Sequence, residues 1–241
     1  MVAYLVTTLA LALGIQLALF LTGLRRARDS KLLDLSYAVT FAVLAGFGLA
    51  AGELEPGRLA LAAIIIFWAV RVAAFAFLGL RFEGFGNRWL MRSIGLWLIL
   101  LPALMAFRLP GLACDMLSLA GFGVWLIGMG VAVISDVQRL RYERDASQRG
   151  KWRQAGLWRY SRYPQYFAEM LIWLGVYLFV LSSMSVASGL VGAISPLLVM
   201  LLVLVTIPES ERRANERWGK NEAYQAYKMR TSLLLIMPPK A

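Results

Sequence analysis

The chain has 241 residues, of which 60% are hydrophobic and 16% are charged, and its formal net charge is +11. Its mean hydropathy of +0.66 is far above that of soluble globular domains. The absence of histidine excludes imidazole catalysis and histidine-bound metal, and Cys114 as the only cysteine excludes a disulfide within the chain or a thiolate cluster. Long apolar blocks instead predict an all-α polytopic membrane bundle, one domain over residues 1–241 without a metal site.

Seven apolar segments are predicted to cross the membrane as helices, each near the roughly 20 residues that a bilayer requires. In chain order they are residues 2–23, 33–52, 59–80, 89–107, 112–134, 166–183 and 189–207. The fourth is interrupted by Arg92 and Pro102. The first lacks a small-residue cleavage site followed by a soluble domain, so we expect a retained helix rather than a removed signal peptide.

Positive charge alternates between the connections of these segments. Four Lys or Arg residues follow the first segment, three follow the third, eight lie between the fifth and sixth, and seven lie in the tail. Only Arg58 and Arg108 fall on the opposite side, and Arg71 lies within a segment. The positive-inside rule therefore predicts a bacterial inner-membrane protein with a periplasmic N-terminus and a cytoplasmic C-terminus. Its cations are expected to meet membrane lipid rather than nucleic acid, since no soluble basic domain is present.

The polar stretch at residues 135–169 holds more chemical groups than topology alone requires. Pro164 suits the first turn of the sixth helix, where its missing N–H costs nothing. The residues predicted to share one face near this turn are Arg162, Gln165, Tyr166 and Glu169. Arginines beside the free N–H groups of a helix N-terminus form a natural anion site.

Glu169 is predicted to lie about one turn inside the membrane, where an unpaired carboxylate costs on the order of 2.5–3.5 kcal/mol. We expect Arg162 or Arg159 to be its partner. The alternative interpretation is an ordinary interfacial belt, in which arginines snorkel and aromatic residues anchor the chain. The aromatic residues concerned are Trp158, Tyr160 and Tyr163.

The run GLWRYSRYPQYFAE at residues 156–169, preceded by Ser135 and Asp136, resembles the C-terminal domain of steroid 5-alpha-reductase-like membrane proteins. These include a bacterial group of unassigned function with the pattern GLWRYSRHPNYxxE. The tail at residues 222–232 resembles the closing YxxYxxRTS element, and the likeness extends over about residues 117–239. It implies a seven-helix bundle that holds NADPH in a cytoplasm-facing cavity and reduces an activated carbon–carbon double bond of a lipid. Residues 1–110 would form the substrate side, and residues 111–241 the cofactor loop and tail.

The resemblance implies cofactor-binding roles for nine residues. These are Asp136, Arg159, Tyr160, Arg162, Gln165, Tyr166, Glu169, Tyr227 and Arg230. Two motif positions depart from the pattern, with Tyr163 in place of His and Gln165 in place of Asn. A glutamine can still pair with a carboxamide, and arginines suit the 2′-phosphate of NADPH.

The resemblance also suggests three catalytic residues in the N-terminal half. Glu53 matches a Glu that engages an enone carbonyl, whereas Trp68 replaces the usual Tyr and can donate a hydrogen bond but is a negligible acid. Arg71 is expected to be paired, with Glu53 as the candidate partner, in a structural ion pair or in a substrate role. The predicted activity is NADPH-dependent reduction of a lipid-like enone or enoyl substrate.

Two other functions stay open. A membrane methyltransferase of the isoprenylcysteine or phospholipid type, dependent on S-adenosylmethionine, shares this architecture. Its acidic tail motif could be imitated by Glu209, Glu211 and Arg212. A non-catalytic scaffold derived from the reductase fold is favoured by the missing His, Asn and Tyr.

Overall fold

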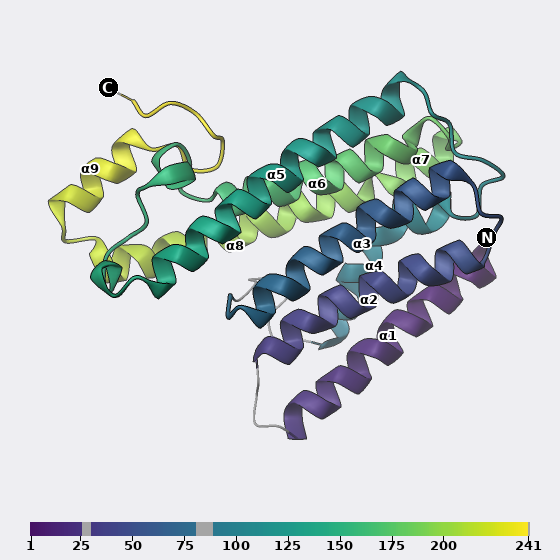
Figure 1. Ribbon diagram of the computed structural model, residues 1–241, viewed down its shortest axis with the longest axis horizontal. Helices are drawn as coiled ribbons and strands as arrows, with labels where there is room; N and C mark the ends of the chain where they lie inside the picture. Colours follow the sequence, from purple (N-terminus) through teal and green to yellow (C-terminus); the bar gives the residue numbers. More distant parts are fainter. Residues whose placement is uncertain (26–29, 81–88, 241) are drawn as a thin grey trace.

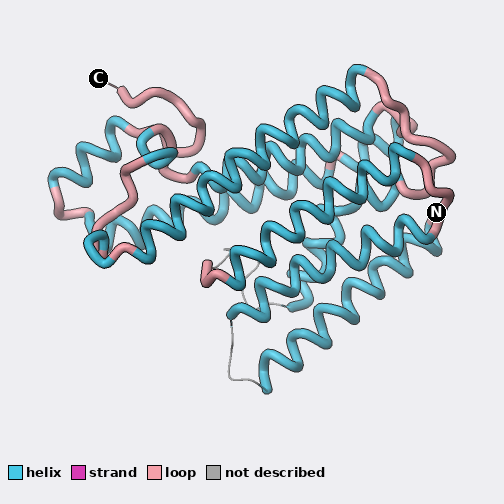
Figure 2. The backbone as a smooth tube through the Cα atoms, in the orientation of Figure 1, coloured by secondary structure: helices cyan, strands magenta, loops and turns pink. Residues whose placement is uncertain are grey.

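The computed structural model describes residues 1–25, 30–80 and 89–240 (Figure 1). In this part of the chain nine α-helices and two short 3-10 helices account for the regular structure. The α-helices are α1 (Val2–Arg25), α2 (Ser30–Ala50), α3 (Pro56–Phe77), α4 (Trp89–Ala106), α5 (Met116–Arg144), α6 (Pro164–Leu181), α7 (Val186–Gly192), α8 (Ile194–Trp218) and α9 (Glu222–Arg230). The 3-10 helices are η1 (Ala146–Gln148) and η2 (Gly156–Arg159). Figure 2 shows an all-helical chain with loops at both ends of the bundle.

Six of the seven predicted segments each overlap one helix, and the seventh, residues 189–207, covers the end of α7 and the first half of α8. Five regions are long and apolar enough to cross a membrane, namely Val2–Thr22, α3, α5, α6 and the continuous region Val186–Trp218 that joins α7 to α8. Shorter apolar helices, Leu35–Ala50 and Ser93–Ala106, lie within α2 and α4. The protein is therefore a multi-pass helical membrane protein, and the number of seven crossings stays a prediction. Four of the charges used for orientation, Arg26, Arg28, Arg81 and Arg88, lie outside the described residues.

Local signals in the sequence set several helix ends. Asp115 caps α5 in a capping box with Ser118, whose backbone N–H donates to the Asp115 carboxylate at 2.9 Å. Pro164 opens α6, as predicted. The expectation that helix five ends near residue 134 is wrong, since α5 continues to Arg144. The last turns of α5 consist mainly of polar residues, which can continue the helix beyond the apolar segment.

The α5–α6 pair is held together by glycines that allow the two backbones to approach closely. A Cβ atom on Gly128 would lie 2.8 Å from the backbone nitrogen of Ile172, and one on Gly175 would lie 2.5 Å from that of Trp125. Small residues at such contacts are typical of helix packing in membranes. In the first half, Gln16 of α1 donates to Thr40 of α2 at 2.9 Å.

The ends of the bundle differ in what they contain. In Figure 1 the N-terminus and the α2–α3, α4–α5 and α6–α7 connections lie at one end. The C-terminus, α9 and the α5–α6 connection lie at the other. The fully buried core includes Phe41, Leu61, Ile65, Leu104 and Ile172, which come from α2, α3, α4 and α6. Helix α4 contacts α1, α2, α6 and α8, and so joins the two halves.

Candidate functional site

A cavity of about 840 Å³ lies where the two halves of the bundle meet. Its lining comes from α2, α3, α4, α5, α6, α8 and α9 and from the segment at residues 145–163. The volume falls within the range of roughly 300–1,000 Å³ that is common for ligand sites. On α8 the lining extends from Val199 to Trp218, which corresponds to roughly 28 Å along a helix. The cavity is thus long enough for a ligand with two separate parts.

The cavity lining changes from apolar to charged along the helices that form it. The apolar end is lined by Tyr37, Phe41, Trp68, Val72, Leu96, Ile99, Trp173, Val199, Leu202 and Val203. The charged end, towards α9, includes Arg139, Glu143, Asp145, Arg149, Lys151, Arg153, Arg162, Glu211, Arg213 and Arg217. This gradient is the one expected of a helix bundle in a bilayer, where apolar side chains face the hydrocarbon depth and charged side chains lie where the helices leave it.

A cluster of five residues, here called the central cluster, lies between these two ends. The Arg71 Nε atom is 2.7 Å from a carboxylate oxygen of Asp136, and its Nη1 atom is 2.8 Å from Glu169 Oε1. The indole N–H groups of Trp68 and Trp173 donate to Glu169 Oε2 at 2.9 and 3.3 Å. The side chains of Arg71 and Asp136 are 3% exposed, and that of Glu169 is 23% exposed. Helices α3, α5 and α6 therefore meet at one guanidinium shared by two carboxylates.

Two sequence-based expectations about ion pairs are corrected by this cluster. Glu53 is not the partner of Arg71, because it precedes α3 at the opposite end of the bundle, and Arg71 lies 15 residues, roughly 22 Å, beyond Pro56. Glu169 pairs with Arg71 rather than with Arg162 or Arg159. The Trp68 N–H also donates to this carboxylate, and its catalytic role stays a prediction.

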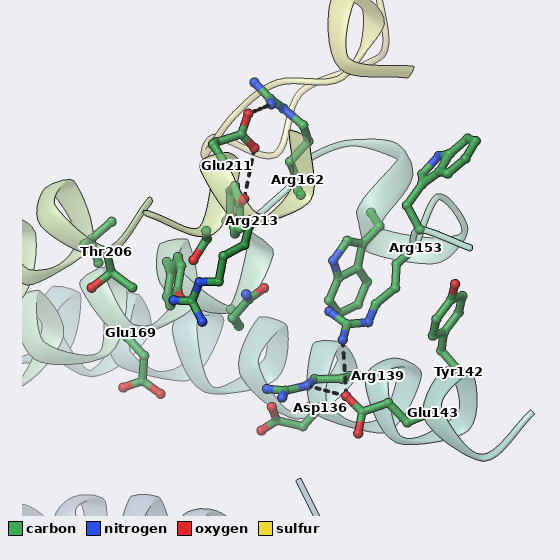
Figure 3. Close-up of a pocket in the computed structure, with 18 of the residues that line it drawn as sticks. Asp136, Arg139, Tyr142, Glu143, Arg153, Arg162, Glu169, Thr206, Glu211 and Arg213 are labelled. Carbon is green, nitrogen blue, oxygen red and sulfur yellow. Dashed lines mark hydrogen bonds and ion pairs between the residues drawn. The ribbon is translucent and has the colours of Figure 1, made fainter. Parts of the chain in front are cut away.

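At the charged end, two acidic residues each gather more than one donor (Figure 3). Glu143 Oε1 accepts from Arg139 at 2.9 Å and from Arg153 at 3.2 Å. Glu211 pairs with Arg162 and with Lys228, and it accepts from the Tyr163 hydroxyl at 2.9 Å. Burial, together with the Glu211 carboxylate, raises the pKa of the Tyr163 phenol well above its usual value, so this hydroxyl remains a donor.

The motif segment, residues 156–169, is held against the C-terminal tail by hydrogen bonds. Gly156 has a φ of 64°, and the next N–H, of Leu157, donates to the Gln138 side chain at 2.9 Å. The Tyr227 hydroxyl donates to the carbonyl of Trp158 at 2.8 Å, and burial raises its pKa. The Arg162 N–H donates to the carbonyl of Ser232 at 2.9 Å. The two segments that carry the sequence resemblance therefore form one structural unit.

The cavity favours an anionic ligand that carries a hydrogen-bond donor. Among the described residues, eight cations and five carboxylates line it, which leaves an excess of positive charge. The buried Gln165 Oε1 atom has no hydrogen-bond partner in the described part of the protein. A buried acceptor of this kind is usually paired, so a ligand N–H is its natural partner.

The structure brings most of the predicted site residues together. Those that line the cavity are Trp68, Arg71, Asp136, Arg162, Gln165, Tyr166, Glu169 and Tyr227. Arg159 and Tyr160 are exposed and lie outside the lining, and Arg230 lines a separate hollow of about 310 Å³ with Arg162 and Lys228. Glu53 lies at the other end of the bundle.

The tail residues considered for a methyltransferase do not act together. Glu211 lines the cavity, whereas Glu209 and Arg212 pair with each other at 2.7 Å with side chains about half exposed. The acidic motif of that family is therefore not assembled around the cavity by these three residues.

Sequence reasoning missed several lining residues. Two of them are Tyr37, whose phenol lines the apolar end, and Trp173, which is the second indole that donates to Glu169. Trp173 follows Glu169 by four residues and so lies on the same helix face, which is a signal that spacing alone provides. Nothing local marks Tyr37 within its apolar segment, because its neighbours in the cavity come from other helices.

Comparisons with known proteins identify a family over the C-terminal part of the chain. Residues 81–231 match the model of a family described as "Protein of unknown function (DUF1295)". Searches of curated proteins and of solved structures gave no match. The matched region contains Asp136, Gln165 and Glu169. It begins after Tyr37 and Arg71, which therefore lie outside it. Since this region covers more than half of the sequence, the chain belongs to the DUF1295 family.

Proposed function

We propose that the protein is a membrane-embedded reductase that uses NADPH to reduce a carbon–carbon double bond of a lipid-like enone or enoyl substrate. The observation that carries this proposal is one elongated cavity with an aromatic, apolar end inside the bundle and a cation-rich end beside the C-terminal tail. An apolar chain fits the first end, and a phosphorylated nucleotide fits the second. The likeness of residues 156–169 to the steroid 5-alpha-reductase-like motif supports the same assignment.

The residues present fit NADPH. The unpaired Gln165 Oε1 atom suits the N–H groups of a carboxamide, and the cations of the charged end suit phosphates. Since Arg159 and Arg230 lie outside the cavity, the phosphates are assigned instead to Arg153, Arg162 and Arg213. When bound, NADPH would supply the hydride of the reaction.

The central cluster would stabilise charge during the reaction. With one guanidinium and two carboxylates, Arg71, Asp136 and Glu169 carry a net negative charge when all are ionised. Three N–H donors hold the Glu169 carboxylate in place, one from Arg71 and two from indoles. A fixed negative charge here would favour the positive charge that develops on a nicotinamide as a hydride leaves it.

The proton of the reduction is assigned to Tyr37. Glu53 is too far from the cavity, and the Trp68 indole is both engaged and a negligible acid. Tyr37, which is 8% exposed, brings a phenol to the apolar end of the cavity. It would donate a hydrogen bond to the substrate carbonyl and a proton to the carbon that does not receive the hydride, and then recover the proton from water.

The orientation in the membrane is part of the proposal. By the positive-inside rule, the charged end of the cavity would face the cytoplasm of a bacterium, where NADPH is available, and the N-terminus would face the periplasm. The exposed Cys114 in the α4–α5 connection would then face the periplasm. An impermeant thiol reagent should label it in intact cells, and a cytoplasmic reporter fused to Ala241 should be active. Labelling only after lysis would reverse the orientation.

The function is tested with the purified full-length protein in detergent. NADPH should bind, and its oxidation should be accelerated by at least one member of a panel of steroid, sterol and enoyl lipids. Tight binding of S-adenosylmethionine without NADPH would instead indicate a methyltransferase. No accelerated oxidation with any substrate, together with no nucleotide binding, would favour the scaffold.

A further inference from the structure

Three aromatic rings gather at the far end of the cavity, away from the central cluster. They are Trp152 in the α5–α6 connection, Trp218 at the end of α8 and Tyr224 on α9. The Trp152 ring centroid lies 5.3 Å from that of Tyr224 and 6.5 Å from that of Trp218. All three residues line the cavity, and Trp152 and Trp218, which are partly exposed, give the group a face towards a ligand, whereas Tyr224 is buried.

This aromatic group is fixed by its surroundings. The Trp218 N–H donates to the carbonyl of Gly150 at 2.7 Å, which fastens the connection to the end of α8. Tyr224 is 3% exposed, and Asn221 caps its helix. A rigid aromatic surface of this kind needs little ordering when a flat ligand stacks on it.

Trp152 differs from Trp218 in one respect. Its indole N–H is buried and has no hydrogen-bond partner in the part of the chain that the structure describes. An unpaired donor is costly in a low-polarity environment, and this one belongs to a residue of the cavity lining. A ring nitrogen of a stacked heterocycle would accept this hydrogen bond.

Cations surround the same rings. The Arg217 guanidinium lies 5.0 Å from the Trp218 ring, and Arg149 and Lys151 line the cavity next to Trp152. Aromatic faces that stack a base, an N–H donor that meets a ring nitrogen and cations that meet phosphates together form the chemistry of a nucleotide site.

We propose that Trp152, Trp218 and Tyr224 form a subsite for the purine base of a nucleotide, with the Trp152 N–H donating to the base. On α8, Trp218 lies 15 residues, roughly 22 Å, beyond Val203, the last apolar lining residue before the polar ones. The base is thus held far from the apolar end, and the rest of the nucleotide extends towards Gln165. The inference rests on the proposed function for the NADPH ligand, but the base subsite is independent of the reacting group.

The test uses the full-length protein in detergent and titration calorimetry with 2′,5′-ADP, which is the adenosine half of NADPH. Trp152→Phe keeps a ring and removes the N–H, and it should weaken binding several-fold. Trp152→Ala removes the stacking surface as well and should weaken binding by more than about tenfold. The matched control is Trp97→Phe, because the Trp97 N–H bonds Thr8 at the interface of α1 and α4.

The outcomes separate this inference from the proposed function. NADPH binding that is equally tight in Trp152→Ala would overturn the base subsite and leave the reductase proposal standing. Binding of 2′,5′-ADP and S-adenosylmethionine that depends on Trp152, without NADPH oxidation, would support the subsite and overturn the reductase. If 2′,5′-ADP, NADPH and S-adenosylmethionine all fail to bind at millimolar concentration, the subsite is overturned. Unchanged thermal stability of Trp152→Phe shows that its effect is on the ligand.

Discussion

Among the described residues, helices α2–α4 supply six of the ten residues at the apolar end of the cavity and one cation, Arg71. Helices α5, α6, α8 and α9 and their connections supply the other four, together with seven cations and five carboxylates. The family match over residues 81–231 covers the whole of α5–α9 and also includes α4. The difference indicates a division of labour in which the C-terminal half recognises a charged ligand and the N-terminal half shapes the space for an apolar one. The two halves are joined through Arg71, the cation that crosses between them.

The largest expected effect on stability comes from removing the Arg71 guanidinium, which pairs with both carboxylates. Arg71→Met leaves Asp136 and Glu169 without their shared cation inside the bundle. Loss of one partner of a buried ion pair costs about 3–5 kcal/mol, so we expect a strong fall in the free energy of unfolding in detergent. The control is Arg212→Met on the exposed face of α8, which should leave the free energy of unfolding essentially unchanged.

A compensating variant sharpens this result. Arg71→Met combined with Asp136→Asn and Glu169→Gln removes the uncompensated charges and should recover much of the stability. If Arg71→Met alone is as stable as the unmodified protein, the two halves are not joined in this way.

The second effect concerns chemistry rather than folding. Tyr37→Phe should lower the rate of NADPH oxidation with an active lipid substrate by roughly 10²-fold or more, which is the usual contribution of a general acid. NADPH binding should be unchanged, because Tyr37 lies at the apolar end. Tyr177→Phe is the control, since its hydroxyl donates to Gly189 at the opposite end of the bundle. An unchanged rate would assign the proton to water.

A smaller effect is expected at Gln165. Gln165→Leu should weaken NADPH binding by about 0.5–1.5 kcal/mol, the net value of one neutral hydrogen bond. Thermal stability should not fall, because the Gln165 Oε1 atom has no partner to lose in the described structure. Gln165→Asn should keep activity. Equal binding of NADPH by all three proteins would mean that the amide faces no ligand.

The smallest effect is a change of preference with salt. If arginines of the charged end hold the 2′-phosphate, NADPH should bind more tightly than NADH at low ionic strength. The preference should narrow as screening shortens the Debye length from about 10 Å at 0.1 M to about 3 Å at 1 M. Titrations of both nucleotides at these two salt concentrations measure it, and a preference independent of salt would contradict a purely electrostatic origin.

The sequence predicted the helices well because length and hydrophobicity are local properties. It also predicted that Gln165 and Glu169 lie on one side of a helix, since helical spacing determines this, and both line the cavity with Arg162, which lies two residues before α6. The sequence did not predict the partners of Arg71, because Asp136 and Glu169 lie 65 and 98 residues further along the chain. The nearer acid, Glu53, lies at the wrong end of α3, and the rise of a helix could have excluded it.

Arg159 shows a different limit. The motif suggested that it faces the cofactor, but η2 and the Ser161–Ser232 bridge set the direction of this segment, and Arg159 remains exposed. Such local turns depend on contacts with the tail, which lies about 70 residues further along the chain. Spacing within the motif contains no information about them.

The sharing of Arg71 between two acids has an evolutionary consequence. The guanidinium lies outside the region of the family match, and both carboxylates lie inside it. A relative that replaced the arginine alone would inherit two unbalanced charges, so the three positions should change as a set. Homologues with a neutral residue at the position of Arg71 should carry at least one neutral residue at the positions of Asp136 and Glu169, and their lineage should record the exchange as a correlated substitution.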